Sequence, residues 1–177
     1  MIASGIEQRH ILLLDDDAEE RKSLKHGLKS LGLTDISEAD DPIAALEIMR
    51  ARPVDLLICE HYIPFVWFLR TNVKRPAAYT PILMLSRQHR REDIREAVDC
   101  GVNRFLAKPI APEELLEHIR QVFEDPEAFV ESAGYIGPDR RRRGNVSGRR
   151  SKATRRMEEP ALDTMLTPEE IAALLER

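Results

Sequence analysis

Residues 10–17 read HILLLDDD, an apolar run that stops at three consecutive aspartates. A short uninterrupted apolar run is typical of a strand that is buried on both faces, as in a parallel sheet. Asp17 is a candidate N-cap for a following helix, because Glu19 and Glu20 are acidic residues suited to a first helical turn. This stretch predicts a buried strand that places acidic residues in the loop before a helix.

The same alternation of apolar strand and amphipathic helix recurs along the chain. Further strands are expected at residues 36–39, 54–59, 81–85 and 104–107, each followed by a helical pattern. Strands that alternate with amphipathic helices predict a parallel sheet covered on both faces. Because crossovers between parallel strands are right-handed, the expected fold is a doubly wound α/β domain with a five-stranded parallel sheet, over residues 9–125.

Composition limits the classes of function. The chain has 177 residues, of which 42% are hydrophobic and 33% are charged, enough for one cored domain and an extension. Aromatic residues are only 5%, which argues against base stacking on single-stranded nucleic acid as the main activity. Neither a transmembrane helix nor a signal peptide is expected. Cys59 and Cys100 are too few for a disulfide framework or a zinc site, so the expected location is cytoplasmic.

The residues beyond the strand and helix pattern are different in character. Residues 126–165 are expected to form a basic linker or extension, because Arg, Gly, Pro and Ser are frequent there. A short C-terminal helix is expected over residues 166–177, starting near Thr167 and Pro168. The basic stretch suits a plain linker, a docking segment for an acidic partner, or a nucleic-acid or membrane-surface patch. Its arginines include Arg140, Arg141, Arg142, Arg143, Arg149 and Arg150.

Polar residues follow several of the predicted strands. Ligands of doubly wound sheets bind at the carboxyl ends of the strands, so Asp15, Asp16 and Glu60 are expected to meet there. Three clustered carboxylates suit Mg²⁺, which usually keeps several waters. Ser86 offers a hydroxyl and Lys108 an ammonium group, and both are useful around a phosphoryl group. The sequence therefore predicts an acidic pocket in which Asp15, Asp16 and Glu60 are candidate metal ligands.

Four segments together resemble a bacterial response-regulator receiver domain of the CheY-like type. They are ILLLDDD at residues 11–17, VDLLICEHYIP at 54–64, TPILMLS at 80–86 and GVNRFLAKPI at 101–110. The resemblance covers residues 9–125 and implies the flavodoxin-like receiver fold and a place in two-component signal transduction or a phosphorelay. By position, Asp15 and Asp16 match the acidic pair that holds Mg²⁺, and Lys108 matches the lysine that pairs with the phosphoryl group or the acidic site. Ser86 matches the hydroxyl residue that meets the phosphoryl group, and Phe105 matches the aromatic switch residue.

Glu60 departs from the family pattern, because it occupies the place of the phosphoacceptor aspartate. Glutamate extends the nucleophile by one methylene, and misplacing a reacting atom by about 1 Å can cost roughly a hundredfold in rate. Three interpretations stay open: Glu60 mimics the phosphorylated state, the site only scaffolds, or phosphorylation persists at Glu60 or a neighbouring aspartate. The aromatic stretch at residues 65–68 is a second departure, and it is either core or an exposed partner patch.

The sequence predicts an atypical response regulator, a pseudo-receiver that is not an enzyme. It is expected to act as a signalling adaptor through protein–protein contacts, independently of phosphorylation at Glu60. The expected partner is a kinase, a regulator or another signalling protein, and a homodimer is an option. One alternative is a conventional phosphorelay receiver with an unusual acceptor. The other is a nucleic-acid-associated regulator that uses the arginine-rich tail.

Overall fold

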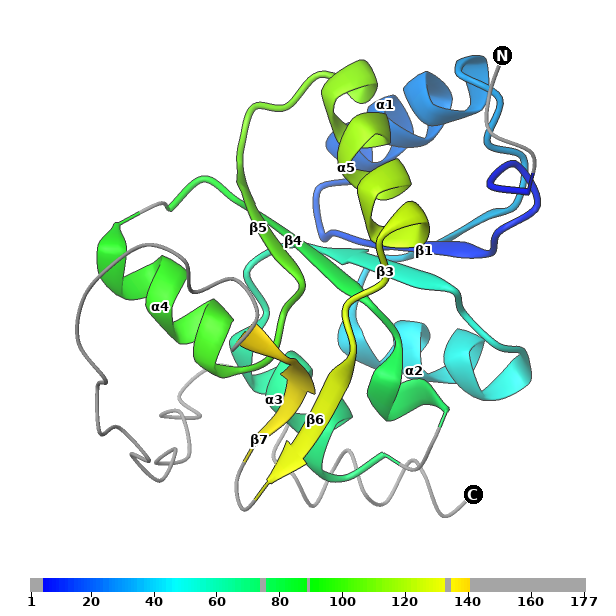
Figure 1. The fold of residues 1–177 in the computed structure, drawn as a ribbon. Helices are drawn as coiled ribbons and strands as arrows, with labels where there is room; N and C mark the ends of the chain where they lie inside the picture. The colour runs from blue at the N-terminus through cyan, green and yellow to red at the C-terminus, as the bar shows by residue number, and fades with distance from the viewer. Residues whose placement is uncertain (1–4, 74–75, 89, 133–134, 141–177) are drawn as a thin grey trace.

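The computed structural model describes residues 5–73, 76–88, 90–132 and 135–140. Five parallel strands form one sheet in the order β2-β1-β3-β4-β5 (Figure 1), which confirms the predicted α/β fold. The strands are β1 (Ile11–Leu14), β2 (Ile36–Ala39), β3 (Leu56–Cys59), β4 (Ile82–Ser86) and β5 (Arg104–Ala107). The helices are α1 (Ala18–Ser30), α2 (Pro42–Ala51), α3 (Ile63–Thr71), α4 (Arg91–Asp99) and α5 (Pro112–Glu124), with a 3-10 turn η1 (Ala77–Tyr79).

The sheet separates two apolar cores, because successive side chains of a strand point to opposite faces. Ile11 and Leu13 of β1 pack with buried residues of α1 and α5. Leu12 and Leu14 pack on the other face with buried residues of α2, α3 and α4. Figure 1 shows α1 and α5 together on one side of the sheet and α2 and α3 on the other. Both faces of the central strands are therefore covered, as the apolar runs predicted.

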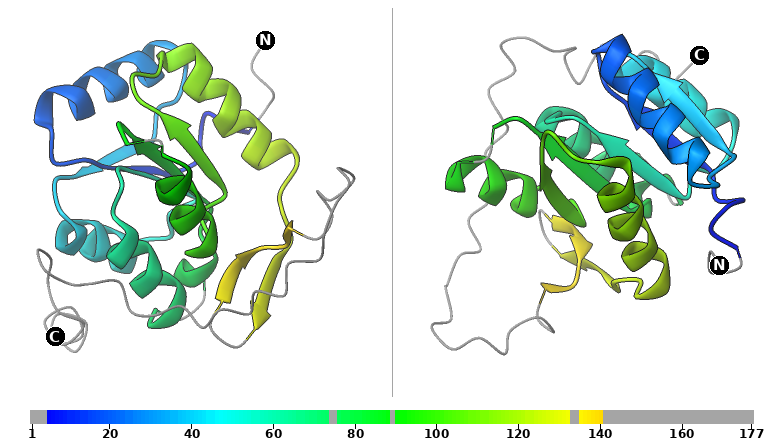
Figure 2. Two further views of the ribbon diagram at one scale, coloured as in Figure 1. Left: turned by 90° about the vertical axis from the view of Figure 1, so that its left-hand side faces the viewer. Right: turned by 90° about the horizontal axis from the view of Figure 1, so that it is seen from above.

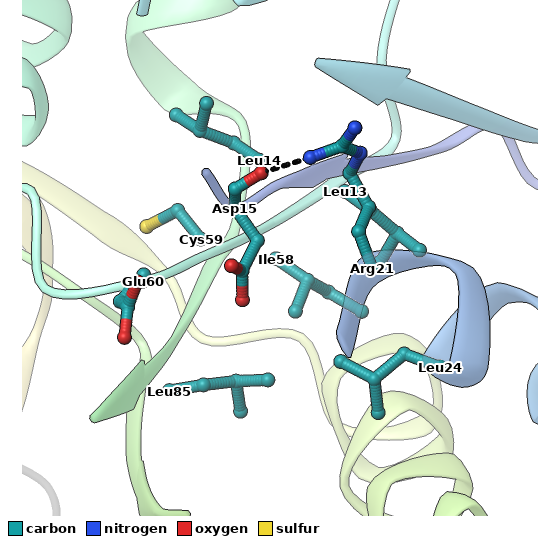
Figure 3. A pocket seen from close by; sticks show the side chains of 9 residues that line it. All are labelled: Leu13, Leu14, Asp15, Arg21, Leu24, Ile58, Cys59, Glu60 and Leu85. Carbon is teal, nitrogen blue, oxygen red and sulfur yellow. Dashed lines mark hydrogen bonds between the residues drawn. The ribbon is translucent and has the colours of Figure 1, made fainter. Parts of the chain in front are cut away.

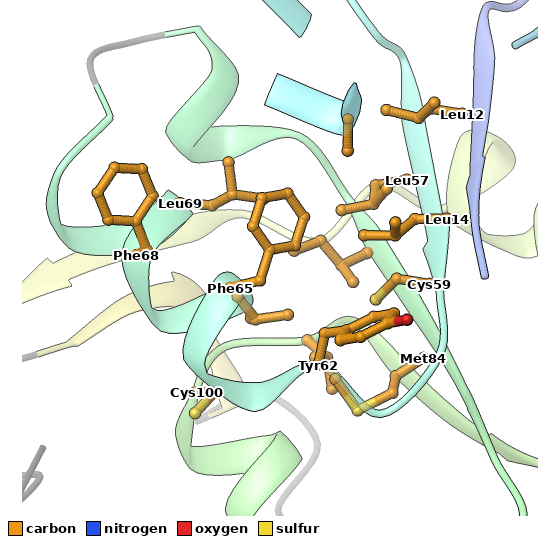
Figure 4. Packing of buried hydrophobic residues seen from close by; sticks show 14 of the residues in the cluster. Leu12, Leu14, Leu57, Cys59, Tyr62, Phe65, Phe68, Leu69, Met84 and Cys100 are labelled. Atoms are coloured by element: carbon orange, nitrogen blue, oxygen red, sulfur yellow. The ribbon is translucent and has the colours of Figure 1, made fainter. Parts of the chain in front are cut away.

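The aromatic stretch at residues 65–68 belongs to the core. Phe65, Val66 and Phe68 are buried in α3, and Trp67 is partly buried against the same cluster. Figure 4 shows Phe65 directed toward Leu57 and Leu14 of the sheet. Of the two interpretations of this stretch, the structure supports core packing rather than an exposed partner patch.

An antiparallel hairpin follows α5 inside the stretch for which the composition predicted a linker or extension. Its strands are β6 (Phe129–Ser132) and β7 (Tyr135–Pro138), and β7 packs against α3 and η1. Figure 2 shows the hairpin lying beside the main domain rather than extending its sheet. The described residues of this stretch, 126–132 and 135–140, therefore include a hairpin packed against the domain, which the Gly- and Pro-containing composition did not predict.

A buried arginine joins this hairpin to the domain. Arg70 of α3 is only 2% exposed, and its guanidinium donates hydrogen bonds to the carbonyls of Ala78, Thr80 and Gly101. The guanidinium carbon also lies 5.0 Å from the centre of the Phe129 ring in β6. The side chain thus links α3, the turn before β4, the turn before β5 and the hairpin.

The predicted terminal helix at residues 166–177 lies outside the described residues. The same is true of five arginines of the basic patch, Arg141, Arg142, Arg143, Arg149 and Arg150. Arg140 is described, and its guanidinium donates to the Val102 carbonyl at 2.6 Å. Within the described part of the chain, none of the helices combines the length and the apolar character needed to cross a membrane.

Candidate acidic site

The acidic site forms where β1 and β3 end. Leu14 and Cys59 are paired in the sheet, so the residues that follow them emerge side by side. The Glu60 backbone N–H also donates to the Leu14 carbonyl at 3.0 Å. One carboxylate oxygen each from Asp15, Asp16 and Glu60 lies within 4.8 Å of the others. The structure therefore brings together the three carboxylates that the sequence placed at the strand ends.

Asp15 is held firmly at the end of β1. Its side chain is buried, and its Oδ1 accepts the backbone N–H of Asp17 at 2.8 Å. The Arg21 guanidinium donates to the Asp15 backbone carbonyl, as Figure 3 shows. Asp17 in turn caps α1 by accepting the backbone N–H groups of Glu19 and Glu20. The side chain of Asp17 therefore forms the cap predicted from the sequence, and its backbone N–H helps to orient Asp15.

Lys108 lies between three carboxylates. Its Nζ is 2.7 Å from Asp15 Oδ2, 2.7 Å from Glu20 Oε2 and 3.3 Å from Glu60 Oε1, and its side chain is 5% exposed. Burial alone would lower the pKa of this lysine, but the hydrogen bonds to Asp15 and Glu20 outweigh burial and raise the pKa of Lys108. The lysine is therefore a fixed positive charge within the acidic site.

The pKa values of Glu60 and Glu20, both partly exposed, shift in opposite directions. Burial raises the pKa of Glu60, and the Asp15 charge adds to that effect while Lys108 opposes it. The hydrogen bond from Lys108 instead lowers the pKa of Glu20. Of these two carboxylates, the site therefore stabilises the charge of Glu20 and disfavours the charge of Glu60.

Ser86 and Phe105 lie on the neighbouring strands. Ser86 is buried at the end of β4, where its carbonyl accepts the Lys108 backbone N–H at 2.8 Å and its hydroxyl accepts the Gln88 N–H at 3.0 Å. Phe105 of β5 is partly buried, and its ring stands perpendicular to the His61 ring at 6.2 Å between centroids. The Lys108–Pro109 peptide bond is cis. Ser86 therefore lies beside Lys108 at the strand ends, and Phe105 contacts His61, the residue that follows Glu60.

Glu20 joins the site in a way that sequence reasoning missed. The sequence assigned Glu20 only to the first turn of α1. In the structure the Arg87 guanidinium donates to Glu20, whose other oxygen accepts from Lys108. The available signal was position alone, because the first turn of a helix that follows a strand lies next to that strand's carboxyl end.

The carboxylates fit a hard divalent cation. Asp15, Asp16 and Glu60 supply only oxygen donors, and Asp16 is exposed, so water can complete the coordination. Mg²⁺ typically binds through one or two carboxylates and keeps several waters. These three residues would hold the ion, which would offset the excess negative charge beside Lys108.

The family comparison agrees with this geometry. The family model described as the response regulator receiver domain matches residues 11–120. That range contains the whole five-stranded sheet, the three carboxylates and Lys108. A cluster such as Asp15, Asp16 and Glu60 is typical of the receiver magnesium site. The hairpin at residues 129–138 lies beyond the matched range.

Individual relatives cover the same part of the chain. The chemotaxis protein CheY of Pseudomonas aeruginosa is 32% identical over 118 residues, which are 64% of this chain and 95% of that protein. CheY-3 of Vibrio cholerae is 30% identical over 118 residues, 64% of this chain and 91% of that protein. The solved structure of the chemotaxis response regulator CheY4 of Vibrio cholerae superposes with a TM-score of 0.58 and 28% identity, covering 64% of this chain and 98% of that one. The chain belongs to the response regulator receiver domain family.

Proposed function

We propose that this chain is a pseudo-receiver, an atypical response regulator whose output does not depend on phosphorylation at residue 60. It would act as a signalling adaptor through protein contacts and not as an enzyme. The observation that carries the proposal is the Glu60 carboxylate at the end of β3, beside Asp15 and 3.3 Å from Lys108. In the receiver family this is the place of the aspartate that accepts the phosphoryl group.

The chemistry of the acceptor supports the proposal. In a receiver the aspartate oxygen attacks the phosphorus of the donor, a new P–O bond forms, and the bond to the donor's leaving group breaks. A glutamate places its oxygens one methylene further out. A displacement of about 1 Å can cost roughly a hundredfold in rate. Burial also raises the pKa of Glu60, so the site does not stabilise its charge as it stabilises the charge of Glu20.

Glu60 has two interpretations within this function. As a mimic of the phosphorylated state, its carboxylate would hold Lys108 as a phosphoryl oxygen does, and the 3.3 Å contact supports this. As part of a plain scaffold, it would only help to balance the lysine charge, and the shorter contacts of Lys108 to Asp15 and Glu20 support that. We expect Glu60→Ala to leave partner binding unchanged if the site is a scaffold and to weaken it if Glu60 is a mimic.

Signalling proteins are the expected partners of a receiver domain. In the family, partners commonly use the face made by α4, β5 and α5. On this chain Ile94 of α4 is 37% exposed, a large hydrophobic side chain suited to such a contact.

Mg²⁺ would be the cofactor, held by Asp15, Asp16 and Glu60. The cytoplasmic location stays a prediction from the sequence.

The deciding experiment is phosphorylation with a small-molecule donor. The wild type, Glu60→Asp and Glu60→Ala are incubated with Mg²⁺ and acetyl phosphate, and their intact masses are measured. We expect no adduct on the wild type or Glu60→Ala, and a single phosphoryl adduct on Glu60→Asp. A wild-type adduct that disappears in Asp16→Asn or Glu60→Gln contradicts the proposal and favours a phosphorelay receiver with an unusual acceptor.

A further inference from the structure

Lys108 donates hydrogen bonds to three carboxylates, which is as many as its ammonium group can donate. An ammonium group has three N–H bonds, and the Lys108 Nζ contacts Asp15, Glu20 and Glu60. The contacts to Asp15 and Glu20 are both 2.7 Å, whereas the contact to Glu60 is 3.3 Å. Glu20 therefore takes a donor, and a close approach, that a group at residue 60 would otherwise share.

Glu20 is well placed to keep that donor. It lies in the first turn of α1, where its backbone N–H is capped by Asp17 at 3.1 Å. Its second carboxylate oxygen accepts a hydrogen bond from Arg87, which follows β4. Lys108 follows β5, so one carboxylate ties α1 to both loops that flank the acidic site. We call this set of Glu20, Arg87 and Lys108 the Glu20 bridge.

We propose that Glu20 is a positioning residue that holds Lys108 toward α1 and thereby limits phosphoryl acceptance at residue 60. The inference rests on the proposed function and extends it, because it adds a second cause of lost phosphorylation besides the Glu60 substitution. Its consequence is that Glu60→Asp alone restores only a slow receiver. Full restoration requires that Lys108 also be released from Glu20.

The electrostatics of the site favour this role. A charge-assisted hydrogen bond between an ammonium and a carboxylate is about twice as strong as a neutral one. A phosphoryl oxygen must therefore displace a strong partner before it can use that lysine donor. The Glu20 charge also lies at the same lysine that an anionic phosphoryl group would use, and like charges repel.

Glu19 provides a matched control for Glu20. It is the neighbouring acid in the same helical turn, it is capped by the same aspartate, and its side chain is 89% exposed. Its ion pair is with Lys22 at 3.5 Å, outside the acidic site. Glu19→Ala thus removes an equal charge from the start of α1 without removing a partner of Lys108.

The test compares phosphorylation rates in the Glu60→Asp background. The full chain carrying Glu60→Asp, Glu60→Asp with Glu20→Ala, and Glu60→Asp with Glu19→Ala is incubated with Mg²⁺ and acetyl phosphate, and adduct formation is followed by intact mass. We expect the Glu20→Ala pair to react about tenfold faster than Glu60→Asp alone, the effect of freeing one charged hydrogen bond. The Glu19→Ala pair should react at the rate of Glu60→Asp. A merely structural role of Glu20 would not raise the rate.

Hydrogen exchange supplies an independent readout if no variant is phosphorylated. Glu20→Ala in the wild-type background should speed amide exchange in the peptides that contain Arg87 and Lys108, and Glu19→Ala should not. Glu20→Gln keeps an acceptor oxygen and should restore part of the protection. Equal behaviour of Glu20→Ala and Glu19→Ala, in rate or in exchange, overturns the positioning role. A phosphoryl adduct on the wild type instead overturns the proposed function, and the Glu20 comparison can still be made on that protein.

Discussion

At the scale of single residues, Glu60 makes the free energy of unfolding depend on pH. Burial raises its pKa above the usual 4.5, so the folded state binds this proton more tightly than the unfolded chain does. The ionised carboxylate therefore costs stability above the raised pKa, and that cost disappears as the pH falls below about 4.5. We expect Glu60→Gln to increase the free energy of unfolding at pH 7 and to lose this advantage in acid. Urea unfolding at several pH values, with Glu19→Gln as the exposed control, tests this. An advantage that is the same at every pH contradicts it.

Lys108 is expected to stabilise the folded chain by balancing the charges of the acidic site. Replacing it with methionine keeps the length of the side chain but leaves Asp15, Glu20 and Glu60 without their common cation. Removing one partner of a buried charged cluster is strongly destabilising, so we expect Lys108→Met to lower the free energy of unfolding by about 2 kcal/mol at pH 7. Added Mg²⁺ should recover part of the loss, since it supplies positive charge to the same carboxylates.

The control for that variant is a lysine outside the site. Lys22 is exposed and pairs with Glu19 at 3.5 Å, so Lys22→Met should change stability by less than about 0.5 kcal/mol. Urea unfolding of the two methionine variants, with and without Mg²⁺, makes the comparison. Equal losses in Lys108→Met and Lys22→Met would show that the three carboxylates do not depend on Lys108.

The sequence located most of the site but not the connection through Glu20. Asp15, Glu60 and Lys108 could be predicted because each comes directly after an apolar run, and parallel strands end at the same edge of the sheet. Glu20 reaches a lysine 88 residues away in the chain. That contact depends on the direction of one side chain from α1, which no local pattern encodes.

At the scale of elements, the strands were predictable and the hairpin was not. Three strands, β1, β3 and β4, are short apolar runs that are buried throughout, and they stand out in the sequence. The edge strands β2 and β5 contain polar residues and are only partly buried, so they were predicted from their place in the alternation of strands and helices. The hairpin is anchored by Arg70, and a nearly fully buried arginine is rare enough that sequence reasoning places it on the surface. Its burial is made possible by the carbonyls of Ala78, Thr80 and Gly101, which become neighbours only in the folded domain.

Gly101 tests how closely the hairpin packs on the domain. Its φ is +91°, and an added Cβ would meet the Ile136 carbonyl oxygen of β7. Gly5 has a φ of +118° but nothing near the position of a Cβ. Alanine at either position costs about 1–2 kcal/mol for the left-handed backbone. We expect Gly101→Ala to cost about 1–3 kcal/mol more than Gly5→Ala, because only the former adds overpacking. Equal losses in thermal or urea unfolding contradict the close packing.

At the scale of the whole molecule, the acidic site and the hairpin lie at opposite ends of the strands. β4 runs from Ile82, next to the Arg70 contacts at Thr80, to Ser86, whose carbonyl binds Lys108. Five residues of strand separate the two ends by roughly 15 Å. The hairpin therefore supports the base of the domain without touching the acidic site.

Two C-terminal truncations test this separation. A chain that ends after residue 125 loses the Phe129 ring over Arg70, the Tyr79–Glu131 hydrogen bond and the Arg104–Glu127 ion pair, whereas a chain that ends after residue 140 keeps them. We expect the shorter chain to lose about 2–4 kcal/mol of unfolding free energy, since it exposes a packed face and leaves Arg70 partly uncovered. The chain that ends after residue 140 keeps these contacts and should unfold at a higher urea concentration than the chain that ends after residue 125. Mg²⁺ affinity, measured by titration calorimetry, should agree within about twofold in the two truncated chains, because screened charges more than about 10 Å away contribute little. If the chain that ends after residue 125 is as stable as the chain that ends after residue 140, the hairpin does not stabilise the domain. A lower Mg²⁺ affinity of the shorter chain would show that the two ends of the sheet are coupled.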